Sequence, residues 1–295
     1  QNKILLLQLS LEERGTVAMG YWEPHSSSVD FCESDYFLSN YVAEPYNAVS
    51  SFHFVFLGLA GIFHGNPTSE WMFFFPYLIL VFIGLGSIAL HTSLHWFFQS
   101  MDEVPMLWLN TSFLHILSVN QRNKQRSEVN KSDTDITTIC ILVTLLLTVV
   151  YYSNQSWYAA FLIAHNSMLL VIIFWTAHLV FWQNKADNFM FQITKWLFLS
   201  YVVIGSIPWT IDMNFCDLLI PYYDMMGPLK GLTLHVIWHI AAGYGAHLLI
   251  MLLVYDRTKL LKREVKLDWV WFFVPVLSTT KVKNEVNIKK EALCN

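Results

Sequence analysis

Two histidines four residues apart are the first feature of this sequence that could carry chemistry. His235 and His239 share one face of a helix, one turn apart, so they could bind a single metal ion. Alone, such a pair in an apolar helix more often reflects packing or hydrogen bonding. A second stretch strengthens the metal interpretation, because Ser87 and His91 also lie one turn apart and Asp102 follows shortly afterwards.

Imidazoles from His91, His235 and His239 would form an open zinc site of the catalytic type, which keeps one position for water or substrate. Zinc in such a site lowers the pKa of a bound water to about 7. Asp102 could then act as general base, while Ser87 could hydrogen-bond a developing oxyanion. A carboxylate inside a membrane is costly, which favours a functional role for Asp102 over that of a helix-start residue. The set indicates hydrolysis of a lipid amide.

The surrounding sequence is that of an integral membrane protein. Of its 295 residues, 55% are hydrophobic and only 14% are charged, whereas soluble domains carry about 25% charged residues. The charged residues separate apolar stretches, and a helix needs roughly 20 such residues to cross a bilayer. The pattern predicts an all-α bundle of seven transmembrane helices, near 46–64, 72–92, 103–121, 136–152, 157–182, 195–214 and 232–255.

The predicted topology brings the candidate residues to one end of this bundle. We call the side of the N-terminus side A and the other side B; the three histidines and Asp102 all fall in the A-side half. Most basic residues flank side B, which makes it cytosolic by the positive-inside rule. The N-terminus is therefore expected in a lumen and the C-terminus in the cytosol. The expected parts are an extension (1–19), a lumenal segment (20–45), the catalytic bundle (46–255) and a cytosolic tail (256–295).

The lumenal segment is acidic. Its carboxylates are Asp30, Glu33, Asp35 and Glu44. They could offer calcium its oxygen ligands, but the segment lacks the length and the glycine of an EF-hand, and a solvated loop is the simpler interpretation. Cys32 and Cys216 both fall on side A, where an oxidising lumen would permit a disulfide between them.

Several short motifs follow one another between residues 20 and 255. They are GYWEP at 20–24, SVDFCE at 28–33, YVAE at 41–44, Gly86-Ser87 with His91, MDEVPM at 101–106, Trp209 with Asp212 and Cys216, and LHVIWHI at 234–240. Together they resemble the alkaline ceramidase family of seven-helix membrane hydrolases, whose superfamily includes the adiponectin receptors.

The resemblance implies a zinc-dependent amidase that cleaves ceramide or phytoceramide into a sphingoid base and a fatty acid, modulated by calcium. It assigns zinc to the three histidines, with Ser87 and Asp102 beside the metal, and it implies a Cys32–Cys216 disulfide. It also reverses the simpler interpretation of the acidic segment, since it assigns calcium to Asp30, the backbone carbonyl of Phe31, Glu33, Asp35 and Glu44. The expected location is the membrane of the endoplasmic reticulum or the Golgi.

The sequence departs from the family pattern at a few positions. Phe31 stands where Trp is usual, Asp35 where Asn is usual, and Leu90 where Phe is common. An additional carboxylate at Asp35 bears on calcium affinity. The departures as a group bear on the preference for chain length more than on the metal ligands.

Two alternative functions remain open on the sequence. A related superfamily hydrolase would be a receptor-type ceramidase or an enzyme that remodels lipid anchors, and the acidic segment with its cysteine argues against it. A seven-helix receptor or transporter with structural zinc would need a fourth ligand, for which His95, one turn beyond His91, is the candidate. In each case the expected partners are membrane lipids, and no nucleic acid is expected.

Overall fold

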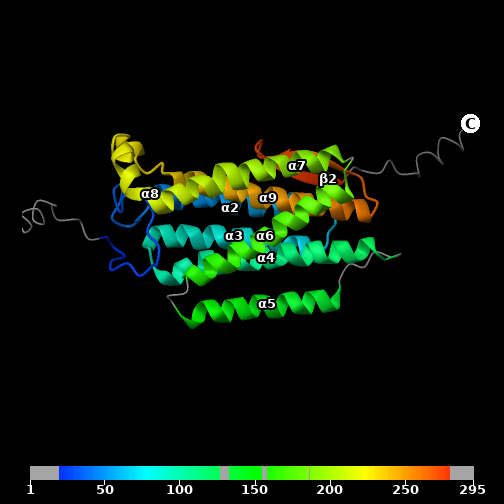
Figure 1. Ribbon diagram of the computed structural model, residues 1–295. Coiled ribbons are helices and arrows are strands. Elements are labelled where there is room, and N and C mark those ends of the chain that lie inside the picture. Colours follow the sequence, from blue (N-terminus) through cyan, green and yellow to red (C-terminus); the bar gives the residue numbers. More distant parts are fainter. Residues whose placement is uncertain (1–19, 127–132, 155–157, 186, 280–295) are drawn as a thin grey trace, which may run out of the picture.

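The computed structural model describes residues 20–126, 133–154, 158–185 and 187–279. In these residues, long helices run side by side along one axis (Figure 1). The α-helices are α2 (Pro45–His64), α3 (Trp71–Ser93), α4 (Trp96–Lys124), α5 (Thr134–Ser153), α6 (Tyr158–His178), α7 (Asn188–Phe198), α8 (Ile207–Asp224) and α9 (Leu234–Leu260). Shorter helical segments are η1 (Leu179–Gln183) and η2 (Leu199–Ser206), both π-helical, and the 3₁₀ turn η3 (Gly227–Leu229).

Six of the described helices are long and apolar enough to cross a membrane. They are α2, α3, α5, α6 with η1, the continuous run from α7 to α8, and α9. These helices confirm a multi-pass, predominantly α-helical protein and coincide with six of the predicted spans. α4 contains the span predicted at 103–121 but falls outside this group, because polar residues such as Asp102, Glu103 and Asn110 lower its hydropathy.

The run from α7 to α8 differs most from its predicted bounds. It extends over 37 residues, Asn188–Asp224, whereas the predicted span covers 195–214. It begins early because the Asp187 side chain accepts a hydrogen bond from the Met190 amide and caps the helix. Near its other end the helix bends at Phe215, whose φ of −129° is not helical.

α9 is the central helix of the bundle. It contacts α2, α3, α4, α7, η2 and α8, and most of its residues are buried. Two glycines allow the close approaches: a Cβ on Gly243 would lie 3.0 Å from His53, and one on Gly245 would lie 2.7 Å from Tyr201. The helix that carries two of the candidate ligands is therefore held on several sides.

The segment after α9 forms a β-hairpin, whereas the sequence predicted only a cytosolic tail at 256–295. Strands β1 (Val265–Val270) and β2 (Val274–Thr279) pair antiparallel. Val274 and Val276 of β2 are buried against Leu57 and Ala60 of α2, and His247 of α9 hydrogen-bonds the Pro275 carbonyl at 2.7 Å. Two strands of six residues give only a weak alternation signal, which explains why the hairpin was missed.

Candidate metal centre and its cavity

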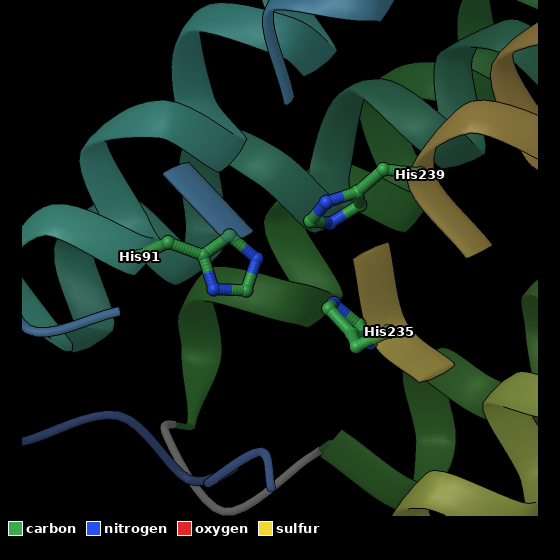
Figure 2. A group of neighbouring side chains, drawn as sticks. All are labelled: His91, His235 and His239. Carbon is green, nitrogen blue, oxygen red and sulfur yellow. The ribbon is translucent and has the colours of Figure 1, made fainter. Parts of the chain in front are cut away.

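Three imidazole rings from two helices meet near side A of the bundle (Figure 2). α3 contributes His91, and α9 contributes His235 and His239 on one face. One nitrogen of each ring lies within 4.8 Å of the corresponding nitrogens of the other two. All three residues are buried, with at most 3% of their surface exposed. The structure thus brings together the three residues predicted to bind zinc.

The hydrogen bonds of these rings fit a metal centre. His91 Nδ1 is bonded to the Glu44 carboxylate, and His239 Nδ1 lies 2.7 Å from Ser50 Oγ. His91 Nε2 and His235 Nδ1 are buried and find no hydrogen-bond partner among the described residues. Buried polar atoms are normally satisfied, and a metal-ligating histidine typically donates its other N–H to a carboxylate or another acceptor. The donor set therefore suits zinc, which takes nitrogen ligands readily.

The two residues predicted to act beside the metal line the same cavity as two of the histidines. This cavity has a volume of about 480 Å³ and a mainly apolar wall, and Ser87, Asp102, His235 and His239 all face it. Ser87 Oγ lies 3.0 Å from Ser51 Oγ of α2, which helps to orient the hydroxyl. The cavity is within the size range of pockets for small-molecule ligands.

Gly86 allows α3 and α4 to meet at this point. A Cβ on Gly86 would lie 2.2 Å from the Met101 carbonyl oxygen and 2.7 Å from the Asp102 amide nitrogen, and these are backbone atoms that cannot turn aside. The glycine is therefore required for the close approach of the α3 and α4 backbones next to Ser87 and Asp102.

Gly86→Ala should accordingly destabilise the protein and lower its activity. We expect a loss of about 1–3 kcal/mol of unfolding free energy, as in other overpacked sites, because the helices must separate. Gly205→Ala is the matched control, since its nearest backbone neighbour, the Ser200 carbonyl oxygen, lies at 3.2 Å. Thermal melting of both variants tests this. Equal melting temperatures for Gly86→Ala and wild type would contradict the role of Gly86.

Asp212 is buried near the start of α9 and does not join the histidine group. Its carboxylate accepts a hydrogen bond of 3.5 Å from the Tyr223 hydroxyl, which in turn accepts one of 3.2 Å from the amide of Leu234, the first residue of α9. It also accepts a hydrogen bond of 3.4 Å from the Cys32 amide. Cys32 forms a disulfide with Cys216. The disulfide and these hydrogen bonds therefore connect the acidic segment and the start of α9 to α8.

The acidic segment divides into two groups. Oxygens of Asp30, Asp35 and Glu44 lie within 4.8 Å of one another and could hold a cation. Glu33 is used differently, because its two oxygens accept hydrogen bonds from the Tyr46 and Asn47 amides at 2.7 and 2.8 Å and so cap α2. The structure thus gathers three of the four predicted calcium carboxylates and places the fourth on a helix terminus.

Phe31 has a position that the sequence did not indicate. Its ring lies over the metal centre, with centroids 3.9 Å from His235 and 5.1 Å from His91, and it lines the cavity. The sequence assigned a calcium ligand to its backbone carbonyl alone. The side chain shields one side of the histidine group from water.

The carboxylates of the candidate cation site repel one another. The pKa of Asp35 is raised to about 7 by partial burial and by the neighbouring charges of Glu44 and Asp30. Burial also raises the pKa of Asp30, and the nearby His25 partly offsets this effect. A divalent cation would relieve this repulsion, which is the expected behaviour of a calcium site.

Two contacts of the metal centre were missed on the sequence. Glu44 was assigned to calcium alone, although it also bonds His91. Ser50 was not singled out, although it lies beside His239. The sequence feature that could have indicated the Ser50 contact is the pair of adjacent serines, Ser50 and Ser51, near the A-side end of an apolar helix. A serine in a membrane helix commonly bonds its own backbone, so the signal was weak.

His95, the candidate fourth ligand, lies outside the histidine group. Its Nδ1 is 3.2 Å from Ser26 Oγ, and the residue stands at the N-terminus of α4. Among the described residues, the group around His91 therefore contains three histidines and no fourth ligand. This arrangement is that of an open site and argues against a closed structural zinc.

The fold and the site define a helical membrane protein with an enclosed group of three histidines at one end of a large apolar cavity. Comparison with known proteins places it more narrowly. The family model described as Ceramidase matches residues 23–278. The chain belongs to this family and is a hydrolase of the alkaline ceramidase type.

Its curated relatives come from distant eukaryotes. Alkaline ceramidase 3 of Mus musculus is 26% identical over 267 residues, which cover 88% of this chain and 94% of that protein. Alkaline ceramidase of Arabidopsis thaliana is 22% identical over 277 residues, covering 90% and 97%. Alkaline ceramidase 1 of Mus musculus is 36% identical over 90 residues, covering 30% and 33%.

Proposed function

We propose that this protein is a zinc-dependent amidase that hydrolyses ceramide or phytoceramide to a sphingoid base and a fatty acid. The observation that carries the proposal is the buried group of His91, His235 and His239. Two of its nitrogens, His91 Nε2 and His235 Nδ1, have no hydrogen-bond partner among the described residues, and two of its members, His235 and His239, line an apolar cavity. An apolar cavity of about 480 Å³ suits lipid chains. The family membership supports ceramide as the substrate.

Each residue of the site has a defined task in this proposal. Bound zinc would supply Lewis acidity toward water and toward the amide carbonyl. Asp102 takes the proton of the attacking water and returns it to the leaving nitrogen. Ser87, oriented by Ser51, donates a hydrogen bond to the carbonyl oxygen as negative charge develops there. Glu44 holds His91 in the tautomer that leaves Nε2 free.

We further propose that α4 also crosses the membrane, which brings the number of transmembrane helices to seven. We also propose that side A faces the lumen of the endoplasmic reticulum or the Golgi. α4 is 29 residues long, so at 1.5 Å per residue it exceeds the bilayer core. It packs against α3, α5, α6 and α9, which surround its polar residues. The Cys32–Cys216 disulfide supports an oxidising compartment on side A.

The direct test is ceramide hydrolysis by the purified protein together with metal analysis. We expect release of the sphingoid base and about one zinc per chain. Asp102→Asn should retain the zinc and lose the activity, because the amide keeps the shape of the carboxyl group but cannot accept the proton. A wild type without zinc, or an active Asp102→Asn variant, would refute the mechanism.

Calcium modulation through Asp30, Asp35 and Glu44 should depend on pH. The folded-state pKa of Asp35, about 7, lies above the 3.8 of a free side chain. Without a cation the folded protein therefore binds more protons than the unfolded chain, and its stability falls as the pH rises from about 4 to 7. Calcium needs the ionised carboxylates, so its stabilising effect should be larger at pH 8 than at pH 6.

Melting temperatures at both pH values, with and without calcium, measure this effect. About a tenth of Asp35 is ionised one pH unit below its pKa, so calcium should bind about tenfold more weakly at pH 6, equivalent to about 1.4 kcal/mol. Asp35→Asn should remove most of this pH dependence. An identical calcium effect at pH 6 and pH 8 would count against the cation site.

A further inference from the structure

Glu103 is a buried carboxyl group that the proposed mechanism leaves without a task. Only 5% of the residue is exposed, and it lines the cavity next to Asp102. None of the ion pairs among the described residues includes it. A carboxylate in a membrane helix without a cationic partner is costly to keep, and by default it indicates a functional role.

Two hydrogen bonds fix the orientation of this carboxyl group. Tyr151 of α5 donates its hydroxyl proton to Glu103 Oε2 at 2.7 Å, and Gln99 Nε2 donates to Oε1 at 2.9 Å. Gln99 is held in turn by Ser28, through bonds of 2.7 and 2.8 Å. An ionised carboxylate accepts about four hydrogen bonds. The remaining acceptor positions of Glu103 are therefore available to a ligand in the cavity.

Glu103 shares the cavity with the residues proposed to act on the amide. Asp102 and Glu103 are consecutive residues of α4, and both line the cavity that Ser87, His235 and His239 also line. In ceramide, the carbon that bears the amide nitrogen is flanked by two carbons that carry hydroxyl groups. These hydroxyl oxygens are three bonds from the amide nitrogen, so an amide bound beside Asp102 would place them in the same part of the cavity, whose wall includes Glu103.

We infer that Glu103 accepts hydrogen bonds from the hydroxyl groups of the amine half of the substrate and so determines specificity for hydroxylated amines. The inference rests on the proposed function and names the feature of the substrate that this part of the cavity recognises. A hydroxyl group buried in an apolar wall needs a partner. A charged acceptor provides a strong one, and a site built around such a bond rejects an analogue that lacks the hydroxyl.

A purely structural role for Glu103 predicts a different result. In that case its bonds to Tyr151 and Gln99 would only tie α5 and the acidic segment to α4. Loss of the carboxylate would then slow the hydrolysis of all substrates by the same factor. The ratio of kcat/KM for a hydroxylated substrate to kcat/KM for its deoxy analogue distinguishes the two roles. A defect that slows both reactions equally leaves this ratio unchanged.

The experiment compares kcat/KM for ceramide and for two analogues with the same chains, one without the C1 hydroxyl and one without the C3 hydroxyl. For the wild type we expect a preference for ceramide of about 10- to 100-fold over at least one analogue. In Glu103→Gln that preference should fall at least about tenfold. Tyr151→Phe removes one hydrogen bond to Glu103 but keeps the Glu103 carboxylate, so the preference for ceramide should persist.

The outcomes also separate this inference from the proposed function. A wild type that does not hydrolyse ceramide refutes the proposed function itself. A wild type that hydrolyses ceramide, with the same preference in Glu103→Gln, refutes only the role of Glu103. If Glu103→Gln turns over too slowly, thermal shifts by sphinganine and by its 1-deoxy and 3-deoxy analogues replace the rates. Equal shifts by all three amines in the wild type would overturn the inference, and so would differences among the shifts that are the same in Glu103→Gln as in the wild type.

Discussion

His235→Ala should abolish activity and zinc binding together. The residue is one of the three clustered histidines proposed to bind zinc, and its Nδ1 has no hydrogen-bond partner among the described residues. Lewis acidity contributes several kcal/mol to a hydrolysis, so we expect activity to fall by at least about a thousandfold. Zinc content per purified chain and the rate of ceramide hydrolysis measure the two effects.

His247→Ala is the matched control for this substitution. His247 is also buried in α9, two turns from His239, but it bonds the Pro275 carbonyl of the hairpin and lies outside the histidine group. We expect it to lose about 1–3 kcal/mol of stability and to retain its zinc. A His235→Ala variant with full zinc content, or a His247→Ala variant without zinc, would contradict the assignment of the ligands.

Glu44→Gln should weaken both candidate cation sites at once. Glu44 holds His91 through Nδ1 and is also one of the three clustered carboxylates. Loss of a carboxylate behind a ligating histidine typically lowers metal affinity or activity about 10- to 100-fold. We therefore expect a lower zinc affinity in chelator titrations and a smaller rise in melting temperature on addition of calcium.

Asp35→Asn provides the comparison for Glu44→Gln. Asp35 belongs to the clustered carboxylates, and among the described residues it pairs with His25, at 3.7 Å, and not with a histidine of the group around His91. It should lose the calcium effect and keep the zinc affinity of the wild type. If Glu44→Gln and Asp35→Asn behave alike toward zinc, then Glu44 does not couple the two sites and its bond to His91 is dispensable.

Much of the fold could be predicted because lipid imposes a simple pattern. The long apolar stretches between charged residues marked the helices, and the A-side position of the candidates followed from their alternating direction. α4 was also predicted, as a span at 103–121, and the structure has this helix. Its hydropathy is lower than that of the other long helices, because polar residues such as Asp102 and Glu103 line a cavity inside the bundle.

The candidate site was predictable where residue type and helical spacing were enough. His235 and His239 are such a pair, and His91 was found through its place at the A-side end of its span. The contacts from other elements could not be found this way. The bond between Glu44 and His91 and the bond between Cys32 and Asp212 join residues far apart in the chain. Only the packing of the helices brings such residues together.

The hairpin after α9 has a consequence for the order in which the protein is assembled. β2 covers Leu57 and Ala60 of α2, the first described helix, so contacts of the last described strand complete the packing of the first helix. During synthesis, α2 enters the membrane long before its covering strand exists. The bundle can therefore reach its final packing only after the ribosome has completed residue 279, and a chain shortened before β2 should remain incompletely folded.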